Sequence, residues 1–288
     1  QIANNSEAEN MWVDAYYTIN IRNNVLGALD VVNETDRTQV EGEARWIRAM
    51  AYFQLVRFYG QAYQPGGNNS QPGVPIVLTP TRKIDEGSFV TRNTVEECYA
   101  QILDDLAKAK TLLPEENGVQ ASKFVTAATM ARVYLQMGRY TEARDEANTV
   151  IESGFYALVS DFAAEWNNDD NSSEDIYAVQ ISSQDFIEAT MVTFYSIPAF
   201  GGRDGDIEIM QKHLDLYDPG DARLALHYSG AGANRTGKWR DQYRNQPVIR
   251  LAEMYLIRAE CNARLGTSVG APVDDDYNAT HTRAGLTA

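Results

Sequence analysis

The stretch Glu43–Gly60, which reads EARWIRAMAYFQLVRFYG, decides the fold of this chain. It contains no proline and no glycine before its last residue, and its apolar residues recur at the spacing of an α-helix. A second apolar face follows the first, so we expect a helix that is buried on most sides. Arg45 and Arg48 form its remaining polar stripe, and Gly60 is a suitable residue to end it.

Two later stretches repeat this plan, with small and apolar residues in a helix that runs up to a glycine: Val125–Gly138 and Val248–Gly266. The first lies in a segment of 34 residues, counted from Ala121 through Gly154, and 34 is the period of a tetratricopeptide repeat. The helices of such a repeat approach closely at small residues and are joined by a tight turn. The small, aromatic, turn, aromatic and small positions of such a repeat are taken here by Ala131, Tyr134, Gly138, Tyr140 and Ala143.

Two further helices are predicted on either side of the central stretch. One is Ser6–Val32, with Ser6 as its N-cap, and a turn over Asn33–Thr38 separates it from the central helix. The other is Thr94–Leu113, which opens with the spacing of a capping box and carries Asp105 on its solvent side. The pattern therefore predicts a mainly α fold of tetratricopeptide-like helical hairpins, with an irregular, loop-rich insertion packed on one side.

We expect a single domain over residues 1–288, with helices at about 6–60, 94–154 and 248–288 and an irregular region at about 155–246. Within the irregular region, Ile176–Ile181 and Val192–Ile197 read as strands, and a short helix is expected from about Asp206 to Leu216. The connection Gln61–Asn93 is also long and irregular, and connections of that length are often functional.

The composition is that of a water-soluble globular protein, with 44% hydrophobic and 23% charged residues. The formal net charge of −15 makes nucleic acid a poor partner. No run approaches the roughly 20 apolar residues that span a bilayer. Cys98 and Cys261 fall in helical patterns and are expected to be small buried hydrophobes rather than a disulfide or a metal site.

No catalytic motif stands out, so we expect no catalytic residues, no cofactor and no metal. The three histidines are dispersed, and the sequence contains neither a GxSxG elbow nor a phosphate-binding loop. The acidic segment Asp169–Asp175 alternates like a calcium loop, but Glu174 stands where such a loop needs glycine. Whether a calcium ion binds there stays open at this stage.

The positive signal is a concentration of aromatic residues in loops. A sugar ring presents an apolar C–H face on which an exposed aromatic ring stacks, with hydroxyls bonded by neighbouring polar groups. The ligand-binding residues predicted on this ground are Trp166, Tyr195, Phe200, Trp239 and Tyr243. Their predicted polar neighbours are Asn167, Asp169, Arg203 and Lys238. If the site lies elsewhere, Gln61–Asn93 with Tyr63 and Phe89 is the next place.

Several motifs together resemble the SusD/RagB family. The segments that carry the resemblance are Glu43–Gly60, the hairpin motif Ala131–Tyr140, the D-A-R-L run at Asp221–Leu224, the run Arg250–Glu260, and the pair Tyr277–Asn278 with Arg283–Leu286. They occur in the family's order over nearly the whole chain. Ala222 replaces the proline of the family's D-P-R-L element.

The resemblance implies a non-catalytic lipoprotein of the outer membrane that faces outward and binds oligosaccharides beside a SusC-like, TonB-dependent transporter. Membrane contact is expected only through an N-terminal lipid that this chain lacks. The family also has a leading segment before the position of Ser6 and a further helix after Ala288. We therefore expect either a trimmed or partial chain or a shortened member of the family.

Two other functions stay open. One is a peptide- or protein-binding tetratricopeptide scaffold without affinity for sugar, because such repeats bind extended segments on concave surfaces. The other is an enzyme with a carboxylate pair in Phe155–Gln246. The large irregular insertion favours the oligosaccharide-binding protein over the scaffold, and the lack of any motif disfavours the enzyme. The glycan, its linkage, the partner transporter and the oligomeric state are not predicted.

Overall fold

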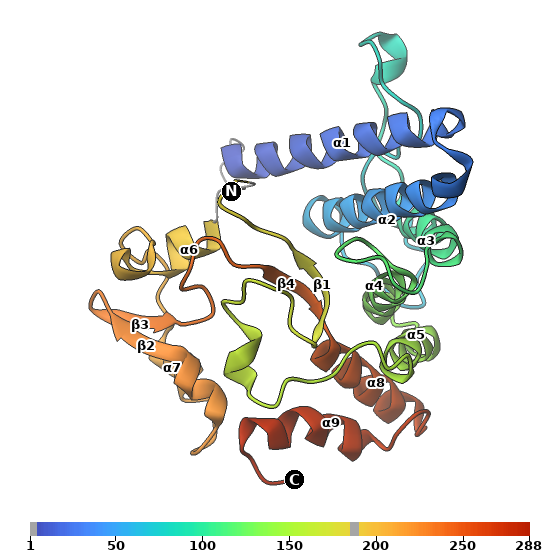
Figure 1. Ribbon diagram of the computed structural model, residues 1–288. Coiled ribbons are helices and arrows are strands. Elements are labelled where there is room, and N and C mark those ends of the chain that lie inside the picture. The colour runs from blue at the N-terminus through green and yellow to red at the C-terminus, as the bar shows by residue number, and fades with distance from the viewer. Residues whose placement is uncertain (1–4, 185–189) are drawn as a thin grey trace. The chain divides into compact units, whose positions relative to one another are not determined.

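The computed structural model describes residues 5–184 and 190–288, and it confirms the prediction of a mainly helical fold with few short strands (Figure 1). Backbone contacts divide the chain into two compact units, Gln1–Glu146 and Ala147–Ala288, which we call unit 1 and unit 2. The prediction of a single domain with its irregular region stays a prediction. Within the described residues, no helix is both long and apolar enough to span a bilayer.

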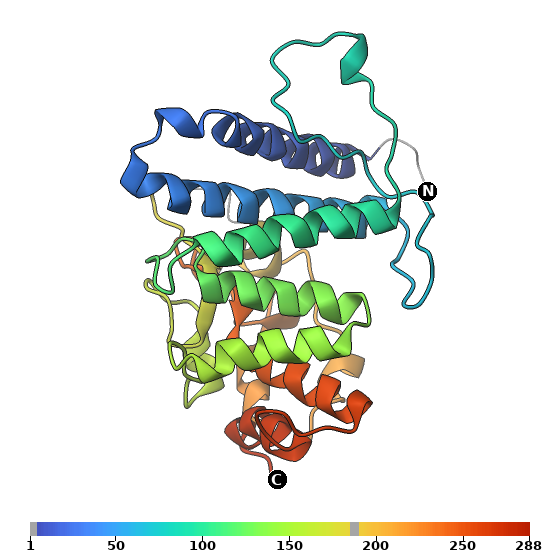
Figure 2. The ribbon, with the colours of Figure 1, turned by 90° about the vertical axis from the view of Figure 1, so that its right-hand side faces the viewer.

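Unit 1 is a stack of helices, which Figure 2 shows lying in successive rows. Its elements are α1 (Ser6–Leu26), η1 (Leu29–Val31), α2 (Glu34–Tyr59), η2 (Glu86–Ser88), α3 (Val95–Leu112) and α4 (Lys123–Gln136). Helix α5 (Tyr140–Glu152) continues across the boundary between the units. Helix α2 packs against α1 and α3, and α3 packs against α4. Because α2 lies between α1 and α3, its apolar residues Tyr52, Phe53 and Leu55 are buried, as its sequence predicted.

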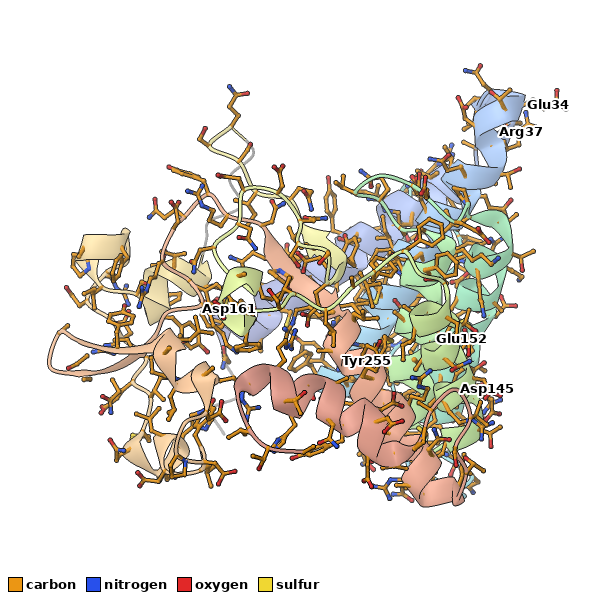
Figure 3. All side chains as sticks on the ribbon, turned by 60° about the horizontal axis from the view of Figure 1, so that its bottom comes forward. Glu34, Arg37, Asp145, Glu152, Asp161 and Tyr255 are labelled. Carbon is orange, nitrogen blue, oxygen red and sulfur yellow. The ribbon has the colours of Figure 1, made fainter. Side chains whose placement is uncertain are left out.

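Helix α2 begins at Glu34, nine residues before the predicted stretch, so the predicted turn over Asn33–Thr38 is wrong (Figure 3). The carbonyl oxygen of Asn33 already accepts hydrogen bonds from the amides of Asp36 and Arg37. Acidic residues in this first turn suit the positive end of the helix dipole, which the apolar pattern alone does not reveal. At the other end, Gly60 follows the helix as predicted.

The prediction that Arg48 and Asp105 lie on the polar, solvent-facing sides of their helices is wrong. The two residues form a buried ion pair in the core of unit 1. Arg48 is 5% exposed and Asp105 0%. Arg48 Nε donates to Asp105 Oδ2 at 2.8 Å, and Nη2 donates to Oδ1 at 2.7 Å. Arg48 Nη1 also donates to Asn23 Oδ1 at 2.8 Å, so the pair joins α1, α2 and α3. Helical spacing places a charge on a face but does not show that a partner covers it.

The ends of the other unit 1 helices follow local chemistry. Helix α1 has Asn5 rather than Ser6 as its N-cap, and it ends at Leu26 instead of Val32 because the weak helix former Gly27 follows. The predicted capping box that opens α3 is present. The hairpin of α4 and α5 is confirmed, and Gly138 adopts a φ of +70° in its turn, which favours glycine.

Unit 2 consists of short elements joined by loops. They are η3 (Phe162–Glu165), β1 (Asp175–Val179), α6 (Thr190–Tyr195), η4 (Pro198–Phe200), α7 (Gln211–Leu214), η5 (Ala222–Leu226), β2 (His227–Gly230), β3 (Ala233–Thr236), β4 (Gln246–Arg250), α8 (Leu251–Leu265), α9 (Val273–His281) and η6 (Thr282–Ala284). Strand β1 pairs with β4 and β2 pairs with β3, both antiparallel. Helices α8 and α9 pack together, and a buried pair between Arg258 and Asp276 joins them.

Three predicted elements of unit 2 differ in the structure. The run Val192–Ile197 is not a strand, because most of it forms α6, in which the Ser196 amide donates to the Val192 carbonyl at 3.0 Å. The predicted helix Val248–Gly266 begins only at Leu251, since the residues before it form β4 opposite β1. The predicted helix Asp206–Leu216 shrinks to α7. Short apolar runs fit a strand or a helix equally well, so tertiary contacts decide.

Candidate functional site

Three of the five predicted ligand-binding residues lie in one aromatic cluster of unit 2. The rings of Trp166 and Trp239 have centroids 6.3 Å apart and meet edge to face at 76°. The Tyr195 ring lies 4.7 Å from Trp239, tilted by 52°. All three side chains are half-buried. They come from three separate segments, so we call Trp166, Tyr195 and Trp239 the ring cluster.

The other two predicted residues lie in different surroundings. Phe200 stacks edge to face on Tyr228 with a centroid distance of 5.4 Å. The guanidinium of Arg240 lies over both rings, 5.1 Å from the Phe200 centroid and 4.8 Å from that of Tyr228. Tyr243 is the most exposed of the five, at 41%.

Two polar side chains bring the segments of the ring cluster together. Asn167 has a φ of +62°, a left-handed conformation that asparagine adopts more readily than most residues. Its Nδ2 donates to the Gly237 carbonyl at 2.9 Å, and its Oδ1 accepts from the Arg240 amide at 2.6 Å. The Ser196 hydroxyl donates to the carbonyl of Trp239. Asn167 therefore fixes Trp166 beside Trp239, and Ser196 fixes the Tyr195 segment to the same loop.

Asn167 is one of the predicted polar neighbours of the ligand, whereas Ser196 is not among the predicted residues. The structure uses both polar atoms of the Asn167 amide on the backbone, so it is a positioning residue for the ring cluster. An asparagine that follows a loop tryptophan is a weak signal for such a role, because asparagine favours turns. Nothing in the sequence near Ser196 indicates its contact, which bridges 43 positions along the chain.

Of the remaining predicted polar neighbours, only Lys238 contacts the ring cluster. Its Nζ lies 4.5 Å from the Trp166 ring centroid, a cation–π contact. Burial lowers the pKa of Lys238, and the nearby charge of Arg250 acts in the same direction. Asp169 pairs instead with Arg244. Arg203 pairs with Asp206 at 2.8 Å and lies over Phe194.

A group of buried carboxyl side chains lies next to Trp166 in the chain. Asp161, labelled in Figure 3, caps η3 through a 2.9 Å bond from the Ala163 amide, and η3 ends at Glu165. Glu165, Glu174 and Asp175 are all buried. Burial raises the pKa of Glu165 to about 8 and also raises that of Asp175. Protonation of Glu165 at neutral pH therefore limits the negative charge buried beside the cluster.

These carboxyl groups are held by side chains of unit 2. Arg250 Nη1 lies 3.3 Å from Glu174 Oε1, and Arg283 pairs with the other oxygen of Glu174. Ser172 donates to Glu165 through its hydroxyl at 2.6 Å and to Asp175 through its amide at 2.8 Å. Among the described residues, no three His, Cys, Asp or Glu side chains form a group suited to a metal ion. Within the segment that resembled a calcium loop, Asp169 pairs with Arg244, Glu174 pairs with Arg250 and Arg283, and Asp175 accepts from Ser172.

Comparison with protein families finds two matches along the chain. Residues 1–135 match a family model described as SusD-like, starch-binding and associating with the outer membrane. Residues 226–288 match a model described as the SusD family. A curated relative, SusD-like protein P2 of Formosa agariphila, is 30% identical over 146 residues, which are 49% of this chain and 26% of that protein. The chain thus matches about a quarter of that relative's length.

Solved structures share the fold over nearly the whole chain. A protein of Bacteroides vulgatus, described as a putative sugar binding protein, has a TM-score of 0.84 at 28% identity and matches 95% of this chain and 64% of its own. A SusD-like carbohydrate binding protein from the same organism has a TM-score of 0.84 at 22% identity, over 96% of this chain and 62% of its own. At 22% identity, the similarity to this second structure shows a shared fold and nothing more.

Proposed function

Because the chain belongs to the SusD/RagB family, we propose that it is a cell-surface protein that captures oligosaccharides for a SusC-like, TonB-dependent transporter. The description of the first family model names starch and the outer membrane, and two solved relatives are described as sugar or carbohydrate binding. Those relatives are longer than this chain. Transfer of the glycan to a transporter, and anchoring by an N-terminal lipid, belong to the proposal.

One observation carries the proposal: three half-buried rings from separate segments, two in loops and Tyr195 at the end of α6, meet in the ring cluster. Aromatic faces bind the C–H faces of pyranose rings, and neighbouring polar groups bind the hydroxyls. Asn167 and Ser196 hold the loops in place before a ligand arrives. A preformed site loses less conformational entropy on binding than a mobile one.

Cationic side chains lie beside the rings and add polar specificity. Lys238 and Arg250 lie over Trp166, with Lys238 Nζ at 4.5 Å and Arg250 Cζ at 5.0 Å from its ring centroid. Ammonium and guanidinium groups donate several hydrogen bonds each and accept none. Sugar hydroxyls accept such bonds, and so do the carboxylates of acidic sugars. The ring cluster of unit 2 is thus suited to neutral and to anionic oligosaccharides.

We propose that the protein binds and releases its glycan without cleaving it. A hydrolase needs an acid and a base that both reach the scissile bond. Glu165, which precedes Trp166 in the chain, and Glu174 and Asp175 are buried and are engaged by Ser172, Arg250 and Arg283. Such contacts favour a structural role for them.

The proposal is tested by affinity electrophoresis of the purified chain in gels that contain neutral and acidic polysaccharides, followed by calorimetry with their oligosaccharides. We expect retardation by at least one glycan, which chromatography then recovers at its original length. Turnover that is lost on replacing a single carboxylate would make the protein an enzyme. Absence of binding to every glycan would favour the peptide-binding scaffold.

A further inference from the structure

Unit 1 contains a pocket of about 530 Å³ that the ring cluster does not involve. One wall is α1, and the other is the segment 75–90, which rises above α1 and carries η2 (Figure 1). The walls include the aromatic side chains of Trp12, Tyr16, Tyr17 and Phe89. Its volume lies in the usual range for small-ligand sites, roughly 300–1,000 Å³.

The two walls are tied together without a ligand. Tyr16 Oη donates to the Pro75 carbonyl at 2.7 Å, and Asn23 Nδ2 donates to the Val77 carbonyl at 2.9 Å. The side chain of Asn20 accepts from the Thr81 amide at 2.8 Å. These bonds span 54 to 61 positions of sequence and fix the irregular segment on the helix. The pocket is therefore a built feature of unit 1.

Rings with large exposed surfaces stand on both walls. Tyr17 on α1 is 66% exposed, and Phe89 on the opposite segment is 81% exposed. Trp12 serves a different purpose, because its ring contacts Tyr59 at 5.0 Å and lies under the Arg92 guanidinium. The Trp12 ring is thus part of the fixed wall, whereas Tyr17 and Phe89 present surface that the fold does not use.

The polar groups of the pocket determine which hydrogen bonds it offers to a ligand. Among the described residues, no hydrogen-bond partner meets the hydroxyls of Tyr17 and Thr81, since Thr81 uses only its backbone in the contacts with Asn20. None of the described residues that line the pocket is charged. Exposed rings with hydroxyl groups beside them suit a pyranose. Arg82 and Lys83 line a neighbouring pocket, and Arg92 donates to backbone carbonyls, so no cation of the lining itself pairs with a uronic acid or a sulfate ester.

We propose that this pocket is a second saccharide-binding subsite, one that takes an uncharged pyranose between Tyr17 and Phe89. The inference rests on the proposed function and assigns a second place of contact in unit 1. It differs from the ring cluster in selectivity, because the cluster has Lys238 and Arg250 beside its rings. The two subsites thus respond differently to the charge of a glycan.

The test uses calorimetry of the full chain with neutral malto-oligosaccharides and with oligogalacturonides. Phe89→Ala and Tyr17→Ala are compared with Phe58→Ala, a control whose ring is 64% exposed on α2 and does not line the pocket. Stacked rings contribute enough to raise the Kd for the neutral glycan about 2- to 10-fold in each pocket variant. Phe58→Ala is expected to bind like the parent. Tyr17, Phe58 and Phe89 are exposed, so their replacement by alanine is expected to leave the fold intact, and circular dichroism verifies this.

Thr81→Val provides a second variant that keeps the backbone contacts and removes only the hydroxyl. Weaker neutral-glycan binding in the pocket variants, with Phe58→Ala unchanged, supports the subsite. If the parent binds glycans and all three pocket variants bind them equally well, the subsite is wrong and the proposed function stands. If the parent binds no member of either series, the neutral subsite is overturned. Binding only to oligogalacturonides also overturns it, because the pocket has no cationic side chain.

Discussion

Units 1 and 2 differ in what holds them together. Unit 1 is built on helices of 14 to 26 residues, whose apolar faces pack on each other and enclose one buried ion pair. Most elements of unit 2 have three to six residues, too few to be stable by local propensity. In unit 2, side chains bond to distant backbone carbonyls instead. The buried Arg235, for example, donates to the carbonyls of Ile207 at 2.8 Å and Gly230 at 3.1 Å.

Units 1 and 2 are therefore sensitive to substitution at different kinds of position. A packed helix tolerates many substitutions on its solvent-exposed face. A set of loops depends instead on a few polar side chains, and no neighbouring residue replaces their hydrogen bonds when one is substituted. In unit 1 the sensitive point is the buried pair of Arg48 and Asp105. In unit 2 it is the set of side chain to backbone bonds around the ring cluster, so stability and ligand binding change together there.

The largest effect is expected for Asp105→Ala in unit 1. The substitution leaves the buried guanidinium of Arg48 without its bidentate partner, and breaking such a pair costs about 3–5 kcal/mol. Urea unfolding measures the change in free energy. The matched control is Asp104→Ala, which removes an exposed pair with Lys108 and is expected to cost under about 1 kcal/mol. Equal effects of the two variants would contradict the buried role of Asp105.

A smaller loss is expected for Asn167→Ala in unit 2. The variant loses two hydrogen bonds to backbone groups and places alanine at a positive φ, which together cost about 1–3 kcal/mol. Because Asn167 holds Trp166 beside Trp239, glycan affinity falls as well. Asn168→Ala is the neighbouring control, since it loses one bond, to the Ala164 carbonyl. Unchanged stability and affinity in Asn167→Ala would show that other contacts hold the ring cluster.

The helices and turns of unit 1 could be predicted from the sequence. The apolar period of α2, the capping box of α3 and the glycine turn of the α4–α5 hairpin are local signals, and all three are confirmed. The inward position of Asp105 could not be predicted, because the exposed Asp104 beside it carries the same charge. Its burial depends on Arg48 from another helix.

For the candidate site, the sequence indicated which aromatic residues to consider but not which of them are in contact. Aromatic density in loops indicated Trp166, Tyr195 and Trp239, and the structure places them in contact. It separates Phe200, which packs on Tyr228 instead. The pairing of Asn167 with residues some 70 positions away depends on tertiary structure, and no periodic signal reports it.

A pH-dependent effect is expected from Glu165, whose pKa burial raises from 4.5 to about 8 in the folded state. Below the unfolded pKa both states carry the proton, and the stabilising contribution is complete. As the pH rises toward 8, only the folded state retains the proton, so the contribution falls and is lost above that pH. The melting temperature of the parent should therefore fall relative to Glu165→Gln between about pH 5 and pH 8.

Glu165→Gln is a suitable reference because its amide keeps the shape of the protonated carboxyl and still accepts from Ser172. Most other carboxylates titrate alike in both proteins, so the difference between the two melting curves reports Glu165 together with Asp175, whose pKa it influences. A constant difference across this pH range would mean that Glu165 keeps an ordinary pKa in the folded protein.

The most direct test of the central claim is calorimetric titration of Trp239→Ala with the glycan that binds the parent best. Trp239 contacts both other rings of the cluster, and its removal is expected to weaken binding about 10-fold or more, beyond one stacking contact alone. Phe58→Ala controls for the loss of an exposed ring. Weaker binding in Trp239→Ala alone is the predicted result. A folded Trp239→Ala that binds the glycan as tightly as the parent would contradict a saccharide site at the ring cluster.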